Sequence, residues 1–371
     1  MIKFRCLDPD NHEVIFGLDD GGKMIKLMMT IKESPQVSDI NCGKSRDKDS
    51  ILSKTFKLSS VKKLFVVGLL PASQENYHNI KSMLDKVNIN AIDMMTLSAD
   101  IKLYLTVLGK QHGKLKYACI YCFGKAPWET EAPLMTIGSL HEYNQKFVDD
   151  NAPLKDAQKY MNVVNKPLIT GDPNTLTMDI INFPQLHCST GASGKLIGAV
   201  ETLVGKEIKE KFFKRNNIHE TEYQGSHSFE GNMARKLLKK IGNMREDIVD
   251  LPQEKKLAVE KVIETIEAFN DVVKSCFAVK IEGDYSSYIQ KFSQLYRSLN
   301  ISITTKVHLI ESHICQFLER KNVPGAGLGM WSEQSFEAAH HDFKVEWQRT
   351  CVSVENENFG EHIFDALVRL E

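Results

Sequence analysis

The sequence predicts an α/β fold with a mixed sheet near the N-terminus and a large, mainly helical region after it. Short apolar runs bounded by turn residues fill the chain up to Cys122, which is typical of strands. From Leu257 onwards, apolar residues recur at helical spacing, which is typical of amphipathic helices. With 371 residues, the chain is long enough for two modules, or for one core with a large insertion.

The first third of the chain presents its strands and helices in an informative order. A Leu-Asp-Asp-Gly-Gly turn separates the first two strands, and the polar residues 33–60 predict a surface loop before the third. Strands are expected at 13–17, 24–31, 63–69, 91–97 and 115–121, and helices at 73–87, with Ser73 as N-cap, and at 101–108. Strand, strand, strand, helix, strand, helix is the order of an RNase H-like α/β domain.

The remainder of the chain is predicted to be mainly helical after one irregular stretch. Residues 126–152 contain Pro127, Pro133 and Gly138 and predict irregular chain. Helices are expected at 257–279, 286–299, 304–318 and 332–349, the last after a glycine-rich loop at 325–329. We therefore expect a first part of the core at 1–125, a mainly helical insertion at 126–300, and two helices at 301–371 that complete the core.

Composition excludes several classes of protein. Lys plus Arg (47) and Asp plus Glu (48) give a net charge of −1, so any affinity for nucleic acid has to come from local patches. No apolar run reaches the ~18 residues of a membrane-spanning helix, and acids within the first twenty residues exclude a secretory signal. Eight cysteines without such a signal indicate a reducing compartment, where a close pair of cysteines is more often a metal-ligand pair than a disulfide.

Three acids stand out by their positions in this pattern. Asp20, or its neighbour Asp19, ends the first strand beside two glycines. Asp100 follows a later strand, and Glu337 lies on the last predicted helix. Carboxylates that meet at one end of a sheet would hold two Mg²⁺ or Mn²⁺ ions, which stabilise the attacking and leaving oxygens in phosphoryl transfer. The alternative for each acid is a turn or a helix cap, and the spacing alone does not decide between them.

A second constellation predicts a zinc site. Cys119 and Cys122 form a C-x-x-C pair, which is half of a tetrahedral site. The other half would be His308 and His313, but residues five apart on a regular helix lie about 140° apart around its axis. Either the helix begins or bends near His308, or one of the two histidines is not a ligand.

Basic residues gather in two stretches, 206–215 and 235–245. Such clusters can neutralise phosphates, with Phe212 and Phe213 interleaved in the first of them. Glu207 and Glu210 lie in the same stretch, so a solvent-exposed helix face is the default interpretation.

Five motifs in one order resemble a known family. They are LKYACIYC, LHCSTGASGKL from Leu186, EGNMARKLL from Glu230, KVHLIESH and GLGMWSEQSFE. This order resembles the catalytic core of the Transib transposases and of the related vertebrate V(D)J recombinase catalytic subunit, both members of the DDE superfamily. The resemblance covers about residues 10–350 and depends on the joint order and spacing of short motifs.

The resemblance implies a fold, an activity and a set of site residues. It implies an RNase H-like mixed sheet, a helical insertion and a C-terminal catalytic helix that nick DNA and then join the freed 3′-hydroxyl to another phosphodiester. Its spacing selects Asp100 and Glu337, and the following glycine favours Asp20 over Asp19. These three acids would bind two catalytic Mg²⁺ or Mn²⁺ ions. One structural Zn²⁺ would be bound by the four residues Cys119, Cys122, His308 and His313.

The resemblance also implies partners and a location. His187, Arg235 and Lys236 would lie near DNA, and the protein would act as a homodimer in the nucleus without a membrane partner. The family's site-specific DNA-binding region, which precedes the catalytic core, is not expected in this chain, which would then be a fragment, a mis-started gene model or a domesticated copy. Two alternatives stay open: a catalytically inactive, zinc-stabilised module that binds DNA or protein, and a nucleotide-binding protein of the actin-like ATPase superfold.

Overall fold

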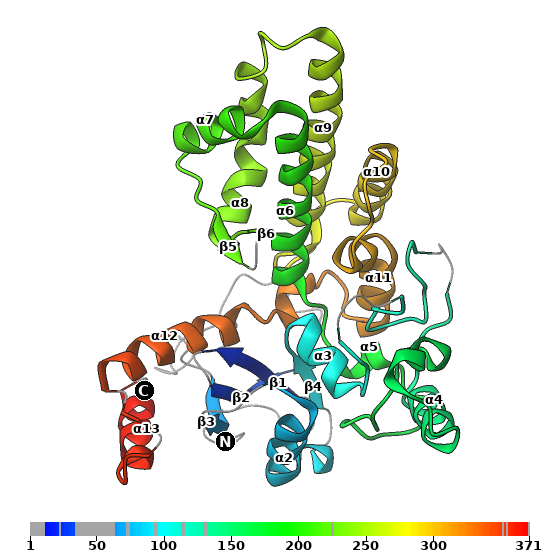
Figure 1. The fold of residues 1–371 in the computed structure, drawn as a ribbon, viewed down its shortest axis with the longest axis vertical. Coiled ribbons are helices and arrows are strands. Elements are labelled where there is room, and N and C mark those ends of the chain that lie inside the picture. The colour runs from blue at the N-terminus through cyan, green and yellow to red at the C-terminus, as the bar shows by residue number, and fades with distance from the viewer. Residues whose placement is uncertain are drawn as a thin grey trace. The chain divides into compact units, whose positions relative to one another are not determined.

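The computed structural model describes residues 12–21, 24–33, 64–71, 75–92, 95–112, 116–128, 132–223, 226–350, 352–353 and 355–369 (Figure 1). The chain divides into two compact units. The first unit comprises Met1–Pro184 with Trp331–Glu371, and the second comprises Gln185–Met330. The division expected from the sequence, into 1–125, 126–300 and 301–371, stays a prediction.

The first unit contains a four-stranded mixed sheet with the order β3-β2-β1-β4. Its strands are β1 (His12–Gly21), β2 (Met24–Glu33), β3 (Phe65–Pro71) and β4 (Met95–Ser98). The three first strands pair antiparallel and β4 pairs parallel with β1. A parallel bridge from Leu97 to Ile181 adds a further segment beyond β4. The predicted α/β fold with a mixed sheet is therefore confirmed.

Helices cover both faces of this sheet. On one face, α2 (Tyr77–Val87) packs against β3, where a Cβ at Gly68 would lie 3.2 Å from Met83. On the other face lies α12 (Gln334–Thr350), and a Cβ added at Gly17 would lie 2.0 Å from the Phe336 ring. Gly17 therefore allows α12 to approach β1 closely, as Figure 1 shows for the orange helix beside the blue strands.

The first unit has further helices after β4. They are η2 (Ile89–Ala91), α3 (Ile101–Val107), α4 (Ile137–Asp149), η3 (Leu154–Tyr160), α5 (Thr177–Ile180) and, after α12, α13 (Phe359–Val368). The helix α13 packs on α12, with the Trp347 and Phe359 ring centroids 5.5 Å apart.

The structure does not confirm three of the local predictions. Irregular chain was expected at 126–152, but a capping box between Thr136 and Ser139 starts helix α4 there. The N-cap of α2 is Asn76, whose side chain accepts a hydrogen bond from the Asn79 N–H, and Ser73 lies outside the described residues. The strand expected at 115–121 is wrong for the described residues 116–121, which form bends, for a reason given with the cysteines below.

The second unit is mainly helical. Its helices are α6 (Gln185–Val204), α7 (Lys206–Asn216), α8 (Gly231–Lys240), η4 (Ile241–Glu246), α9 (Gln253–Cys276), α10 (Tyr285–Ser298), α11 (Thr305–Lys321) and η5 (Leu328–Trp331), with a hairpin of β5 (Thr221–Tyr223) and β6 (Ser226–Ser228). The helices expected at 257–279, 286–299 and 304–318 are confirmed as α9, α10 and α11. Phe269 of α9 and Phe292 of α10 lie in its core with ring centroids 5.0 Å apart.

Within the described part of the chain, no helix combines the length and the hydropathy needed to cross a membrane.

Candidate functional site

Cys119 and Cys122 lie on a tight loop that turns both sulfur atoms to one side. The Tyr121 N–H donates to Cys119 Sγ and the Gly124 N–H donates to Cys122 Sγ, each over 3.3 Å. Residues 133–135 hold the loop, because the Met135 N–H donates to the Tyr121 carbonyl over 2.8 Å. These amides bond to sulfur instead of to a neighbouring strand, which is why the predicted strand does not form.

His308 and His313 lie on α11, which begins after its N-cap Thr304. Both rings are buried, and their Nε2 atoms lie 3.2 Å apart. The predicted difficulty of the five-residue spacing therefore does not arise, since the imidazole side chains turn towards each other from their different positions around the helix. The start of α11 at Thr305 also lies close to His308, as one of the sequence alternatives required.

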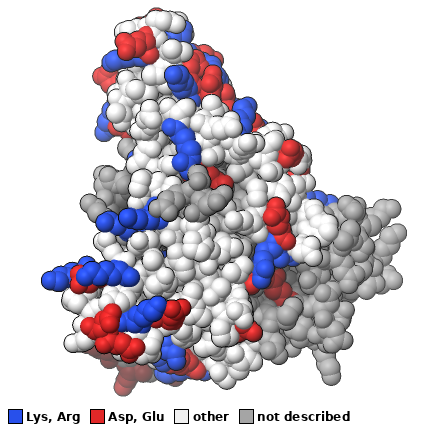
Figure 2. Space-filling view, turned by 90° about the vertical axis from the view of Figure 1, so that its right-hand side faces the viewer, with Lys and Arg blue, Asp and Glu red and all other residues white. Residues whose placement is uncertain are grey.

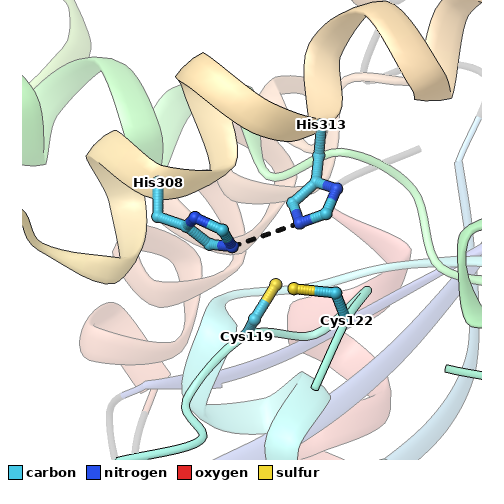
Figure 3. A group of neighbouring side chains, drawn as sticks. All are labelled: Cys119, Cys122, His308 and His313. Carbon is cyan, nitrogen blue, oxygen red and sulfur yellow. Dashed lines mark hydrogen bonds between the residues drawn. The ribbon is translucent and has the colours of Figure 1, made fainter. Parts of the chain in front are cut away.

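The four side chains form one buried group. Each offers one ligand atom, and these atoms all lie within 4.8 Å of one another. Figure 3 shows both sulfurs below the two Nε2 atoms, pointing into the same space. Two thiolates and two imidazoles are a frequent donor set for structural zinc. This group could hold a structural metal ion such as zinc.

Hydrogen bonds on the far side of each histidine favour metal binding. The His313 Nδ1–H donates to the side-chain carbonyl of Gln316 over 2.7 Å, which leaves a lone pair on Nε2 of the neutral ring. His308 Nδ1 lies 3.3 Å from the Ser312 hydroxyl. Partners of this kind fix the tautomer and the orientation of metal-binding histidines. A proton or a cation between the two Nε2 atoms would satisfy both.

The charge environment of Cys119 favours the thiolate, which is the form that binds metal. Burial raises the pKa of the Cys119 thiol, but hydrogen bonds from Cys122 and from the Tyr121 N–H, with the charge of Lys110, bring this pKa below its usual value. Lys110 is itself fully buried, and its ammonium donates to the Cys119 carbonyl over 2.9 Å. Burial lowers the pKa of Lys110 to about 8, against the raising effect of the two cysteines.

The predicted acids lie on elements that meet at one end of the sheet. Gly17 of β1 pairs with Ser98, the last residue of β4, and β1 continues past this pair to Gly21, while Asp100 lies just beyond β4. Asp100 caps α3, where its Oδ1 accepts the Leu103 N–H over 2.7 Å. Glu337 lies in the first turn of α12, directly after the Phe336 that packs on Gly17.

The convergence of these acids on metal ions stays a prediction. Asp20 is the next-to-last residue of β1, and its side chain lies outside the described part of the molecule. Among the described side chains, the Cys119, Cys122, His308 and His313 group stands alone as a set of three or more such residues whose ligand atoms converge.

The side chain of Asp19, the other candidate on β1, forms an ion pair with a histidine of α12. Its carboxylate pairs with His340 Nδ1, and the buried Lys26, which faces Asp19 across β1 and β2, donates to His340 Nε2 over 2.8 Å. Because lysine only donates, Nε2 accepts and Nδ1 carries the proton that points at Asp19. His340 lies three residues after Glu337, so this chain of contacts fixes α12 on the sheet.

Sequence reasoning missed Lys110, Lys26, Gln316 and His340. No pattern marks these two lysines, because Lys26 looks like an interruption of an apolar run and Lys110 lies among glycines and polar residues. Gln316, three residues after His313, and His340, three residues after Glu337, could have been found from helical spacing alone.

The residues predicted to lie near DNA are all in the second unit. Arg235 is exposed on α8, Lys236 is half-buried and donates to the Asn217 carbonyl over 2.7 Å, and His187 is half-buried on α6. On the face drawn in Figure 2, blue Lys and Arg are interspersed with red Asp and Glu.

Much of the basic stretch 206–215 is paired with acids inside the second unit. Arg215 contacts Glu246 and Asp247, at 2.5 and 2.7 Å. Lys209 is buried and contacts Glu201 and Glu220, at 2.6 and 2.8 Å. These pairs support the default interpretation of this stretch as a structural helix and not as a phosphate-binding patch.

Replacing Lys209 with methionine is expected to destabilise the protein by about 3 kcal/mol, because Glu201 and Glu220 would lose the cation that both contact. Urea denaturation followed by circular dichroism measures this change. The matched change Lys206→Met removes only an exposed pair with Glu210 and is expected to cost less than ~1 kcal/mol. Equal stabilities of the two variants would contradict the structural role of Lys209.

Comparison with known proteins identifies no family for this chain. No family model matches the chain, and no curated protein matches it significantly.

Proposed function

We propose that this chain is the catalytic core of a Transib-like DDE recombinase, which nicks DNA and transfers the freed strand to another phosphodiester. The observation that carries the proposal is the meeting of β1, β4 and α12. The last residue of β4 pairs with Gly17 of β1, and α12 begins against the same glycine. Asp20 lies three residues further along β1, Asp100 lies two residues after β4, and Glu337 lies in the first turn of α12. DNA as partner, a homodimer and a nuclear location belong to the same proposal.

The sheet supports an RNase H-like fold for this core. Three antiparallel strands are followed by a parallel β4, and the parallel bridge at Ile181 stands where a fifth strand of that order would lie. The chain then runs through the helical second unit before Trp331 returns it to the sheet. An insertion at this point is what the motif order implies.

The acids would hold two Mg²⁺ or Mn²⁺ ions in this core. Such ions activate a nucleophile and stabilise the charge that develops on the oxygens exchanged at phosphorus. Asp100 suits this role, since one carboxylate oxygen accepts the Leu103 N–H and fixes the orientation of the other. Asp19 is paired with His340, which leaves Asp20 as the ligand that β1 supplies in this proposal. Zinc in the group of Cys119, Cys122, His308 and His313 would be structural.

A cleavage assay tests the proposed function. Purified protein is incubated with nicked or hairpin-prone DNA duplexes and with Mn²⁺ or Mg²⁺, and the products are separated on a denaturing gel. We expect nicks and, later, covalently joined strands that require the metal. An absence of strand cleavage under all conditions would remove the enzyme proposal.

A second candidate is a catalytically inactive, zinc-stabilised module that binds DNA or protein. The observation that favours it is the pairing of Lys209 and Arg215 with acids inside the second unit, together with the net charge of −1 for the whole chain. DNA binding without cleavage in the same assay would select this function. Binding of ATP without any activity on DNA would instead favour the actin-like ATPase alternative.

Replacing Arg235 with alanine is expected to weaken DNA binding without loss of stability, because Arg235 is exposed on α8. If it contacts a phosphate, the slope of log K against log salt concentration should fall by about 1. Fluorescence anisotropy of a labelled duplex at several salt concentrations measures both quantities. The control is Lys261→Ala on α9, and an unchanged slope for Arg235→Ala would exclude a phosphate contact.

A further inference from the structure

A closed ring of hydrogen bonds joins the sheet to the residue that leads into α12. The Trp331 indole Nε1–H donates to Glu13 Oε2 over 3.0 Å, and the Thr96 hydroxyl donates to Glu13 Oε1 over 3.0 Å. The ring closes through a fourth and a fifth residue: Asn182 Nδ2 donates to the Thr96 and Ser98 hydroxyls, at 3.0 and 3.1 Å, and the Ser98 hydroxyl donates to the Trp331 carbonyl over 3.3 Å.

Each hydrogen bond in this ring has a defined donor and a defined acceptor. The single protons of the Thr96 and Ser98 hydroxyls are already used, so Asn182 must present its amide group to both oxygens. Glu13 only accepts when ionised, and both of its oxygens are used. Four of the five members are at most 5% exposed, and Glu13 is half-buried. Removing Glu13 would therefore break two hydrogen bonds of a largely buried network.

The ring lies between the elements that carry the proposed metal ligands. Glu13 is on β1, seven residues before Asp20, and Thr96 and Ser98 are on β4, just before Asp100. Trp331 is six residues before Glu337 and three residues before Gln334, the first residue of α12. The ring thus links the segment that leads into α12 to β1, which carries Asp20, and to β4, which ends two residues before Asp100.

We propose that Glu13 is a positioning residue for Glu337, which it holds in place through Trp331. This inference depends on the proposed function, because it concerns the metal ligand on α12. Glu13 does not touch the reacting atoms. It sets the distance between the Glu337 carboxylate and the ends of β1 and β4, and a displacement of about 1 Å is enough to slow a positioned reaction about 100-fold.

The test compares Glu13→Leu, Trp331→Phe and the double variant. Each single variant is expected to lower kcat for DNA cleavage about 10- to 100-fold, to raise the half-saturating Mn²⁺ concentration about tenfold, and to leave KM for DNA unchanged. The double variant should be no worse than either single variant, because both remove the same link. Glu13→Gln keeps an acceptor for the indole and should restore kcat to within about threefold.

Amide hydrogen exchange tests the positioning without any activity. The Phe336 and Glu337 amides, which bond to the Glu333 carbonyl, should exchange about tenfold faster in Glu13→Leu than in the wild type. The control Glu142→Leu removes an exposed pair with Lys146 on α4 and should change neither exchange nor kcat. Unchanged exchange and unchanged Mn²⁺ dependence in Glu13→Leu would overturn the inference. An inert wild type with the expected exchange would instead refute the proposed function.

Discussion

Replacing Cys119 with serine is expected to release the metal ion from the protein and to unfold the loop around it. Structural zinc contributes about 10–16 kcal/mol of apparent binding free energy in small zinc domains, as much as the whole stability of a typical domain. Serine keeps the size of the side chain but removes the thiolate that the Tyr121 N–H and Lys110 favour. We expect about one zinc per wild-type chain and none in the variant, with a midpoint of thermal unfolding lower by 10 °C or more.

Elemental analysis and calorimetry of the purified proteins measure both effects. Cys276→Ser is the matched control, because this cysteine is also buried but burial raises its pKa to about 12, which keeps it a thiol. The control should retain its zinc. A stable wild type without metal, or a Cys119→Ser protein that keeps its zinc, would contradict the metal site.

Replacing Asp100 with asparagine is expected to abolish DNA cleavage, with a loss of at least about 10³-fold, while the fold stays intact. Asparagine is as good an N-cap as aspartate, so the bond to the Leu103 N–H can remain and only the charge is lost. Alanine would be a poorer choice, because loss of the cap alone costs about 1 kcal/mol. Gel assays of cleavage and thermal unfolding together separate the two effects.

The same substitution at a different cap provides the control for Asp100. Asp284 caps α10 and accepts the Ser287 N–H over 3.2 Å, so Asp284→Asn makes the same chemical change far along the chain from the predicted acids. It should cleave DNA like the wild type. If Asp100→Asn were also as active as the wild type, Asp100 would be a helix cap and nothing more.

Strands and helices with a clear period could be predicted from the sequence. The first two strands follow from apolar runs bounded by a turn, and helices α9, α10 and α11 follow from helical spacing of apolar residues. Helix α4 was missed because Pro133 and Gly138 suggested a loop, whereas the Thr136 cap and the close approach of Gly138 to Pro173 belong to its start. Helix α6 was not predicted, because glycines are unfavourable inside a helix. Gly191 lies where the Lys306 side chain of α11 packs closely against α6.

The ligands of the candidate metal site could be predicted from the sequence, but the contacts around them could not. The C-x-x-C spacing identified the two cysteines, and the family resemblance implied the two histidines that the structure brings beside them. The strand expected through Cys119 was wrong because its amides bond to sulfur, which no periodicity reports. The ring through Glu13 and Trp331 joins residues more than three hundred positions apart, so only the folded chain could show it.

Anomalous diffraction from crystals grown with Mn²⁺ locates the proposed catalytic ions independently of any activity. We expect two peaks about 3.5–4 Å apart, bound by the carboxylates of Asp20, Asp100 and Glu337. Crystals without manganese at this position, or with the Glu337 carboxylate turned away from both aspartates, would contradict this expectation.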